Sequence, residues 1–134
     1  MPSNPTHPPA PATHVTLASS LNALLSTALH DVPVLHDPEL VRWELGVPLR
    51  GGAFCPGSIT AFVGSRTTDP EEVLQAAADR LGGERGPIGR HFYSGGNLYR
   101  TEALRTHWGN IPVAIEVIAP ATVAELEPQL AGER

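Results

Sequence analysis

The sequence predicts an α+β domain with a mainly antiparallel, five-stranded sheet and helices packed on one face of it, in the order α-β-β-α-β-β-β-α. Three observations indicate this fold class: stripes of apolar residues at helical spacing, segments in which apolar and polar residues alternate, and glycine-containing turns between those segments. With 134 residues, of which 41% are hydrophobic and 17% charged, the chain has the size and composition of one soluble domain.

The chain is expected to begin with a flexible, proline-rich arm at residues 1–14, followed by a single α+β domain at residues 15–134. The prolines of the arm fix φ and remove backbone donors, and their neighbours offer little to bury. From Thr16 onward the apolar residues recur at helical spacing, which predicts an amphipathic helix that Pro33 stops. Its expected buried stripe consists of Leu17, Leu21, Leu24, Leu25 and Ala28.

A second helix is predicted between Asp69 and Gly82-Gly83. Asp69 is suited to cap the helix, Pro70 fits its first position, and Glu72 completes a D-x-x-E capping box. Its expected buried residues are Val73, Leu74, Ala77 and Leu81. A short last helix is predicted from about Thr122, with Pro128 ending it and with Val123, Leu126 and Leu130 docking it.

Five segments show the alternation that is typical of strands. In the first two, alternate apolar residues define one buried face, and these residues are Val41, Trp43, Leu45 and Val47, then Ile59, Ala61 and Val63. The other three are residues 88–94, 97–106 and 111–118, separated by turns at Gly95-Gly96 and Gly109-Asn110.

The turn at Gly95-Gly96 predicts which residues of its hairpin share a face. A two-residue loop pairs Ser94 with Asn97 and Phe92 with Tyr99. The face that we expect to look inward carries Ile88, Phe92, Tyr99, Thr101 and Ala103, with Arg90 as its exception. The face that we expect to look outward carries His91, Tyr93, Leu98, Arg100 and Glu102.

The next strand has its own apolar set, which consists of Ile111, Val113, Ile115 and Val117. For this set to join the inward face just described, the preceding loop must contain an odd number of residues, for instance Trp108-Gly109-Asn110 with a bulge. Ala114 and Glu116 would then face outward.

Charge and composition limit the partners. All 9 basic residues are Arg, 14 residues are acidic, and the formal net charge is −5, so the long-range field repels nucleic acid and anionic membrane surfaces. There is no signal-peptide pattern and no apolar stretch long enough for a membrane span, and Cys55 is the only cysteine, so no intrachain disulfide can form. We therefore expect a cytoplasmic protein without a membrane partner.

Two His-Asp dipeptides, His30-Asp31 and His36-Asp37, have residue types that bind divalent metals. Pro33 separates them in what is expected to be a helix exit, where a cationic histidine is favoured by the helix dipole. Cys55 has no recognisable nucleophile motif around it. We therefore predict no metal site, no cofactor and no catalytic residue.

The leading functional hypothesis is a small interaction module, accessory or regulatory, that binds a protein partner or its own copy as a homodimer. It rests on the outward hairpin face, because Tyr, Trp and Arg are enriched in protein contact surfaces. The predicted binding residues are His91, Tyr93, Leu98, Arg100, Glu102 and Trp108. In a dimer, Tyr93, Leu98 and Trp108 would be buried, and Arg100 would pair with Glu102 of the other copy.

Two alternatives stay open. The first is a small enzyme or a protein that binds a small molecule or an anion, with a pocket between the His91/Arg100/Glu102 face and the loop at 48–57, His91 as base and Arg100 as anion clamp. A deep pocket would favour it, whereas a flat face would favour the interaction module. The second, less favoured because of the net charge, is nucleic-acid binding through a strip of arginines, Arg85, Arg90, Arg100 and Arg105.

Overall fold

The computed structural model describes residues 14–46, 57–67 and 69–126. Six strands form one sheet in the order β1-β2-β6-β5-β3, and β4 also pairs with β5. The strands are β1 (Val41–Gly46), β2 (Ser58–Val63), β3 (Glu84–Pro87), β4 (Phe92–Ser94), β5 (Asn97–Trp108) and β6 (Ile111–Pro120). The helices are α1 (His14–Ser26) and α2 (Pro70–Leu81), with short 3-10 helices η1 (Pro33–His36) and η2 (Val123–Leu126).

The predicted α+β class is confirmed, but the sheet has six strands instead of five, and it is mixed. β2 and β6 are parallel, and the other paired strands are antiparallel. The predicted arm lies outside the described residues except for His14, which begins α1, and so do Val47, the loop at 48–56, Pro128 and Leu130. Among the described helices none is long and apolar enough to cross a membrane.

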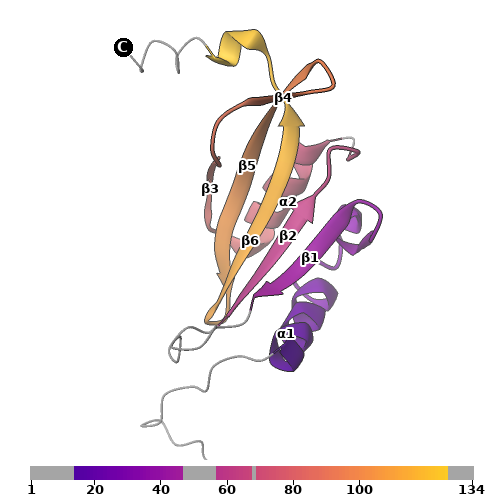
Figure 1. Cartoon of the computed structure of the whole chain (residues 1–134). Coiled ribbons are helices and arrows are strands. Elements are labelled where there is room, and N and C mark those ends of the chain that lie inside the picture. Colours follow the sequence, from indigo (N-terminus) through magenta and orange to yellow (C-terminus); the bar gives the residue numbers. More distant parts are fainter. Residues whose placement is uncertain (1–13, 47–56, 68, 127–134) are drawn as a thin grey trace, which may run out of the picture.

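Both α-helices pack on one face of the sheet, and the strands pass in front of α2 in Figure 1. The core between them consists of the apolar stripes that the sequence predicts. Leu17 and Leu24 of α1 and Leu74 and Ala77 of α2 have no exposed surface, and neither have Ile59 and Ile115 of the sheet. Burying a leucine or isoleucine side chain stabilises the fold by roughly 1.5–3 kcal/mol, so this layer is the main source of stability.

The predicted limits of α2 are confirmed. The Asp69 carboxylate accepts a hydrogen bond from the backbone N–H of Glu72 at 3.1 Å, and Pro70 occupies the first helical position, where no backbone donor is needed. At the other end, the Gly82 N–H donates to the Ala78 carbonyl, and Gly82 adopts φ +71, which a residue with a side chain rarely adopts.

The predicted pairing of the hairpin, Phe92 with Tyr99 and Ser94 with Asn97, is confirmed, but the predicted sides of the two faces of the 97–106 strand are wrong. Trp108 pairs directly with Ile111, so the loop between β5 and β6 holds two residues instead of three. The apolar set of β6 is buried as predicted, but it shares its face with Arg100, Glu102, Leu104 and Thr106. Tyr99, Thr101 and Ala103 therefore lie on the opposite face, because alternate residues of a strand point to opposite sides.

Two other segments also differ from expectation. Of the predicted strand at 88–94 only residues 92–94 form a strand, β4, and the segment before it, residues 84–87, forms the unpredicted strand β3. Gly89 adopts φ +64 between the two strands and interrupts the extended backbone. The predicted last helix is the 3-10 helix η2, whose Val123 is 66% exposed and so does not dock on the core.

Gly83 sets the distance between the start of β3 and β5. It adopts φ +102, and a Cβ atom there would lie 2.4 Å from the Arg105 carbonyl oxygen and 2.7 Å from the Thr106 Cβ. Gly82 has φ +71 but open space around it, and Gly86 has open space and no positive φ, so the two are matched controls.

We expect Gly83→Ala to lower the free energy of unfolding by about 2–4 kcal/mol, because strain and overlap add. Gly82→Ala should lower it by about 1 kcal/mol and Gly86→Ala by less than about 0.5 kcal/mol. Urea unfolding followed by circular dichroism measures all three. Equal losses for Gly82→Ala and Gly83→Ala would contradict the close approach of β3 to β5.

Candidate functional site

By register, five of the six predicted binding residues lie on one side of the sheet, but this is the helix-covered side and not an outward face; the five are Tyr93, Leu98, Arg100, Glu102 and Trp108. Tyr93 is 64% exposed and His91 half-buried, but Leu98 is buried and Trp108 packs against the core. Arg100 and Glu102 lie on the helix-covered side. Arg100 donates a hydrogen bond to Glu102 of its own chain at 2.7 Å, whereas we predicted that it would pair with Glu102 of a second copy. Their predicted orientation is therefore wrong, because the hairpin with β6 turns them toward α2.

Arg100 and Glu102 belong to a charged cluster that ties α2 to β3 and β5. Each Glu102 oxygen accepts from a different arginine, Oε2 from Arg85 Nε at 2.8 Å and Oε1 from Arg100. Both arginines also reach α2, where they form ion pairs with Glu71. Arg85 further donates to the Gln75 side chain at 2.8 Å. The two positive charges are thus balanced by two carboxylates beyond the end of the apolar core.

The cluster keeps Glu102 ionised. Burial raises the pKa of this carboxyl, but the hydrogen bonds and charges of Arg85 and Arg100 together outweigh burial and lower its pKa below the ordinary value. The Glu102 side chain is only 14% exposed, so these contacts are poorly screened by solvent. The cluster therefore stabilises the fold most strongly where Glu102 carries its charge.

His91, Arg100 and Glu102 do line one hollow, of about 280 Å³, together with Arg85 and Arg90. This volume is at the lower limit for small-molecule sites. A base role for His91 and an anion-clamp role for Arg100 stay predictions. The predicted arginine strip is not continuous, because Arg85 and Arg100 are neutralised beneath α2 while Arg105 belongs to the opposite face of β5.

The His-Asp dipeptides are occupied by local contacts. A ring nitrogen of His30 lies 2.7 Å from the Thr27 carbonyl, and one of His36 lies 2.9 Å from the Leu29 carbonyl. Asp31 forms a two-point ion pair with Arg80 at 2.6 and 2.7 Å. The hydrogen bond from Arg80 lowers the pKa of Asp31 to about 2. These residues thus connect the end of α1 to its surroundings and to α2.

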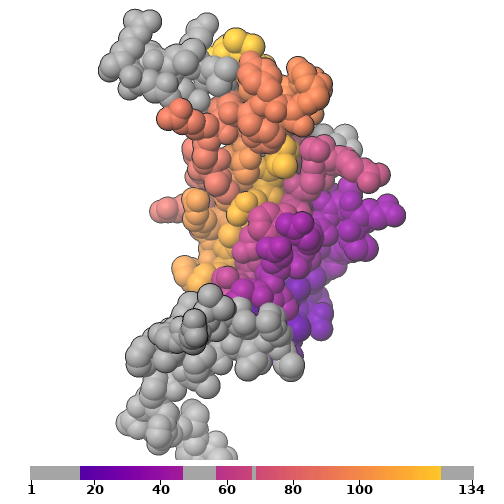
Figure 2. Space-filling model, in the orientation of Figure 1, coloured from indigo at the N-terminus to yellow at the C-terminus, as the bar shows by residue number. Residues whose placement is uncertain are grey.

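The opposite side of the sheet, which we call the open face, is not covered by any described helix, and it is the side that Figures 1 and 2 present to the viewer. Phe92 and Tyr99 stack there with ring centroids 5.7 Å apart, and the guanidinium of Arg42 lies 4.9 Å above the Phe62 ring. Register places the following side chains on this face: Arg42, Glu44, Ser58, Thr60, Phe62, Phe92, Tyr99, Thr101, Ala103, Arg105, His107, Pro112, Ala114, Glu116 and Ile118.

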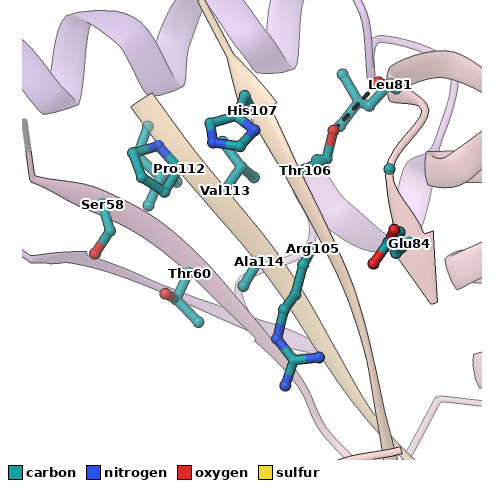
Figure 3. A pocket seen from close by; sticks show the side chains of 12 residues that line it. Ser58, Thr60, Leu81, Glu84, Arg105, Thr106, His107, Pro112, Val113 and Ala114 are labelled. Atoms are coloured by element: carbon teal, nitrogen blue, oxygen red, sulfur yellow. Dashed lines mark hydrogen bonds between the residues drawn. The ribbon is translucent and has the colours of Figure 1, made fainter. Parts of the chain in front are cut away.

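A hollow of about 690 Å³ lies on the open face near the β5–β6 turn. Figure 3 shows Arg105 and His107 along its β5 side, Pro112 and Ala114 on β6, and Ser58 and Thr60 on β2. Small side chains on β2 and β6 form the floor, whereas the longer Arg105 and His107 are exposed beside it. Within the described residues, Arg105, His107 and the two hydroxyl groups have no side-chain partner, so they are available to a ligand or a protein.

This hollow is not among the features predicted from the sequence, although part of its signal is present there. Because Ile59, Ala61 and Val63 are buried, the alternation already places Ser58, Thr60 and Phe62 on the other side. Arg105 and His107 could have been added only by counting two residues in the Gly109-Asn110 turn.

Comparison with protein-family models, with curated proteins and with solved structures found no match to this chain.

We expect Glu102→Gln to lower the free energy of unfolding at pH 7 by about 2 kcal/mol, because both arginines lose their shared carboxylate. The folded-state pKa of Glu102 is lowered, so its contribution is present above the ordinary carboxyl pKa and is lost as the pH falls through the folded-state value. The difference between native chain and variant should therefore shrink on acidification, as urea titrations between pH 7 and pH 3 would measure.

The matched control is Glu84→Gln, which removes an exposed carboxylate of β3 that lies outside the cluster. It should change stability by less than about 0.5 kcal/mol. A loss for Glu102→Gln that stays constant with pH would contradict the ionic origin of the effect.

Proposed function

We propose that the protein is a protein-interaction module and that the open face is its contact surface. The observation that carries this proposal is the composition of that face: aromatic and aliphatic side chains stand beside exposed charges of both signs on a sheet surface that no described helix covers. Phe92 is 37% exposed, which is unusual for a large apolar residue stacked in a hairpin. Contact surfaces are rich in aromatic residues and arginine.

The shape of the open face supports the same proposal. The stacked Phe92 and Tyr99 lie near one end of β5, and the hollow lies at the other end, beside the turn to β6. A second hollow of about 400 Å³ borders Phe62 and Ile118. A projecting aromatic pair and recessed floors give a partner points of shape complementarity, which a flat, uniformly polar sheet would lack.

Binding of a small anionic molecule is the second candidate. It is favoured by the hollow beside Arg105 and His107, since its volume lies within the range of ligand sites and its rim offers a guanidinium, an imidazole and two hydroxyl groups. Glu84 also borders this hollow and opposes a ligand with several negative charges. We therefore rank it behind a protein partner.

Site-specific photo-crosslinking distinguishes the two candidates. We expect p-benzoylphenylalanine in place of His107 or Tyr99 to give the same discrete crosslinked protein in cells that produce the native chain. The probe in place of Asp79, on the exposed side of α2, should give none. Ala114→Arg, which fills the hollow, should abolish the crosslink from His107.

Crosslinks of equal yield and identity from Asp79 would contradict the open face as the contact surface. Protein crosslinks absent from both open-face positions, in a chain that circular dichroism shows to be folded, would favour the small-ligand candidate instead.

A further inference from the structure

The free edge of β1 has unpaired backbone groups in a defined pattern. Within the described residues, β1 pairs only with β2. The Gly64 N–H donates to the Leu40 carbonyl at 2.9 Å, so residue 40 directs its carbonyl toward β2. Because hydrogen-bonded pairs alternate along an antiparallel ladder, Arg42 and Glu44 also bond β2, whereas Val41, Trp43 and Leu45 direct their backbone groups to the edge.

Part of that edge is already satisfied within the chain. The Val41 N–H donates to the Asp37 carbonyl at 2.9 Å. Among the described residues, nothing bonds the Val41 carbonyl or the N–H and carbonyl groups of Trp43 and Leu45, so these groups remain for a further strand. Exposed edges of this kind are pairing sites unless charge, proline or a covering element blocks them. β1 contains no proline, and its two charged residues, Arg42 and Glu44, are of opposite sign.

We infer that β1 pairs with β1 of a second copy, antiparallel and with Trp43 opposite Trp43, so that two sheets join into one. This register brings residues 41, 43 and 45 of the two strands, whose backbone groups point to the edge, opposite one another. The backbone N–H of each Trp43 then donates to the Trp43 carbonyl across the two-fold axis, and the backbone N–H of each Leu45 donates to the Val41 carbonyl of the other copy.

The charges of β1 select this register. With Trp43 at the centre, Arg42 of each copy lies opposite Glu44 of the other. A slip by two residues in one direction places Glu44 opposite Glu44, and a slip in the other direction places Arg42 opposite Arg42. Opposite charges stabilise cross-strand pairs and like charges destabilise them. Within one chain, Arg42 Nε lies 3.5 Å from Glu44 Oε1. The Arg42 and Glu44 side chains are nevertheless 70% and 56% exposed, so both are accessible to a second copy.

The helix-covered side of the edge offers an apolar contact in the same register. A hollow of about 640 Å³ lies beside the edge, lined by Leu25, Leu35, Pro38, Val41 and Trp43 among others. Trp43 is held there by a hydrogen bond from its ring nitrogen to the Leu35 carbonyl at 3.1 Å. Leu45 of the second copy would lie opposite Val41 and cover part of this apolar surface.

This pairing goes beyond the proposed function, since it concerns the edge and leaves the open face accessible. The open faces of the two copies would continue into each other across the new strand pair. The Arg42–Glu44 pairs lie on that side, so substitutions there change the edge and leave the hollow beside His107 intact.

Sedimentation equilibrium of the full chain and its charge variants tests the pairing. The native chain should form a dimer. Arg42→Glu and Glu44→Arg should each raise the dimer dissociation constant about tenfold or more, because each places like charges opposite one another twice. An equimolar mixture of the two variants should recover the native dissociation constant, since all the cross-strand pairs are then of opposite charge. Glu116→Arg, an open-face control on β6, should leave it unchanged.

A native chain that is monomeric at all concentrations would overturn the inference, and so would a dimer that neither charge variant weakens. Recovery in the mixture shows that both variants fold, so a weakened variant that is not rescued by its complement would also count against the pairing. The crosslink from His107 should persist in Leu45→Pro, which removes an edge-directed N–H and changes no side chain of the open face, so failure of the edge is separated from failure of the open face.

Discussion

Gly109 and Asn110 separate Trp108 from Ile111 where β5 turns into β6. Since side chains alternate along a strand, the number of residues in this turn decides which residues of β5 share a face with the apolar set of β6. Gly109 has φ +63 and Asn110 has no positive φ, which fits a type II′ turn with glycine at its first central position. The turn thus sends Leu104 under the helices and exposes Arg105 and His107.

The even number of residues in this turn also explains the charged cluster beneath α2. Once Leu104 is buried, Arg100 and Glu102 must lie on the helix-covered side too. Charged groups removed from water need partners, and Arg85 and Glu71 provide them from β3 and α2. The same turn therefore requires the charged cluster on one side of the sheet and creates the hollow beside Arg105 and His107 on the other.

At the free edge of β1, alternation of backbone groups together with the spacing of Arg42 and Glu44 gives the edge its self-complementary pattern.

Periodicity and capping predicted the parts of the fold in which local signals agree. Leu17 and Leu24, the Asp69 cap, and the described apolar residues of β1, β2 and β6 lie as the sequence indicates. The hairpin faces could not be assigned in this way, because residues 108–110 are compatible with a two- or three-residue loop. The apolar or polar character of the side chains then gave the wrong assignment. Phe92 and Tyr99 are of the type found in cores but lie on the open face, and Arg100 and Glu102 are of the type found on surfaces but lie under α2. The ion pairs with Arg85 and Glu71, which are distant in sequence, make the second arrangement favourable.

The register of β5 against β6 is the central claim, and cross-strand backbone NOEs in the isotope-labelled chain measure it directly. The structure predicts NOEs that place Leu104 opposite Ile115 and Thr106 opposite Val113. NOEs that place Leu104 opposite Ala114 and Thr106 opposite Pro112 would correspond to a three-residue loop. They would exchange the two faces of β5, which would contradict both the charged cluster beneath α2 and the composition of the open face.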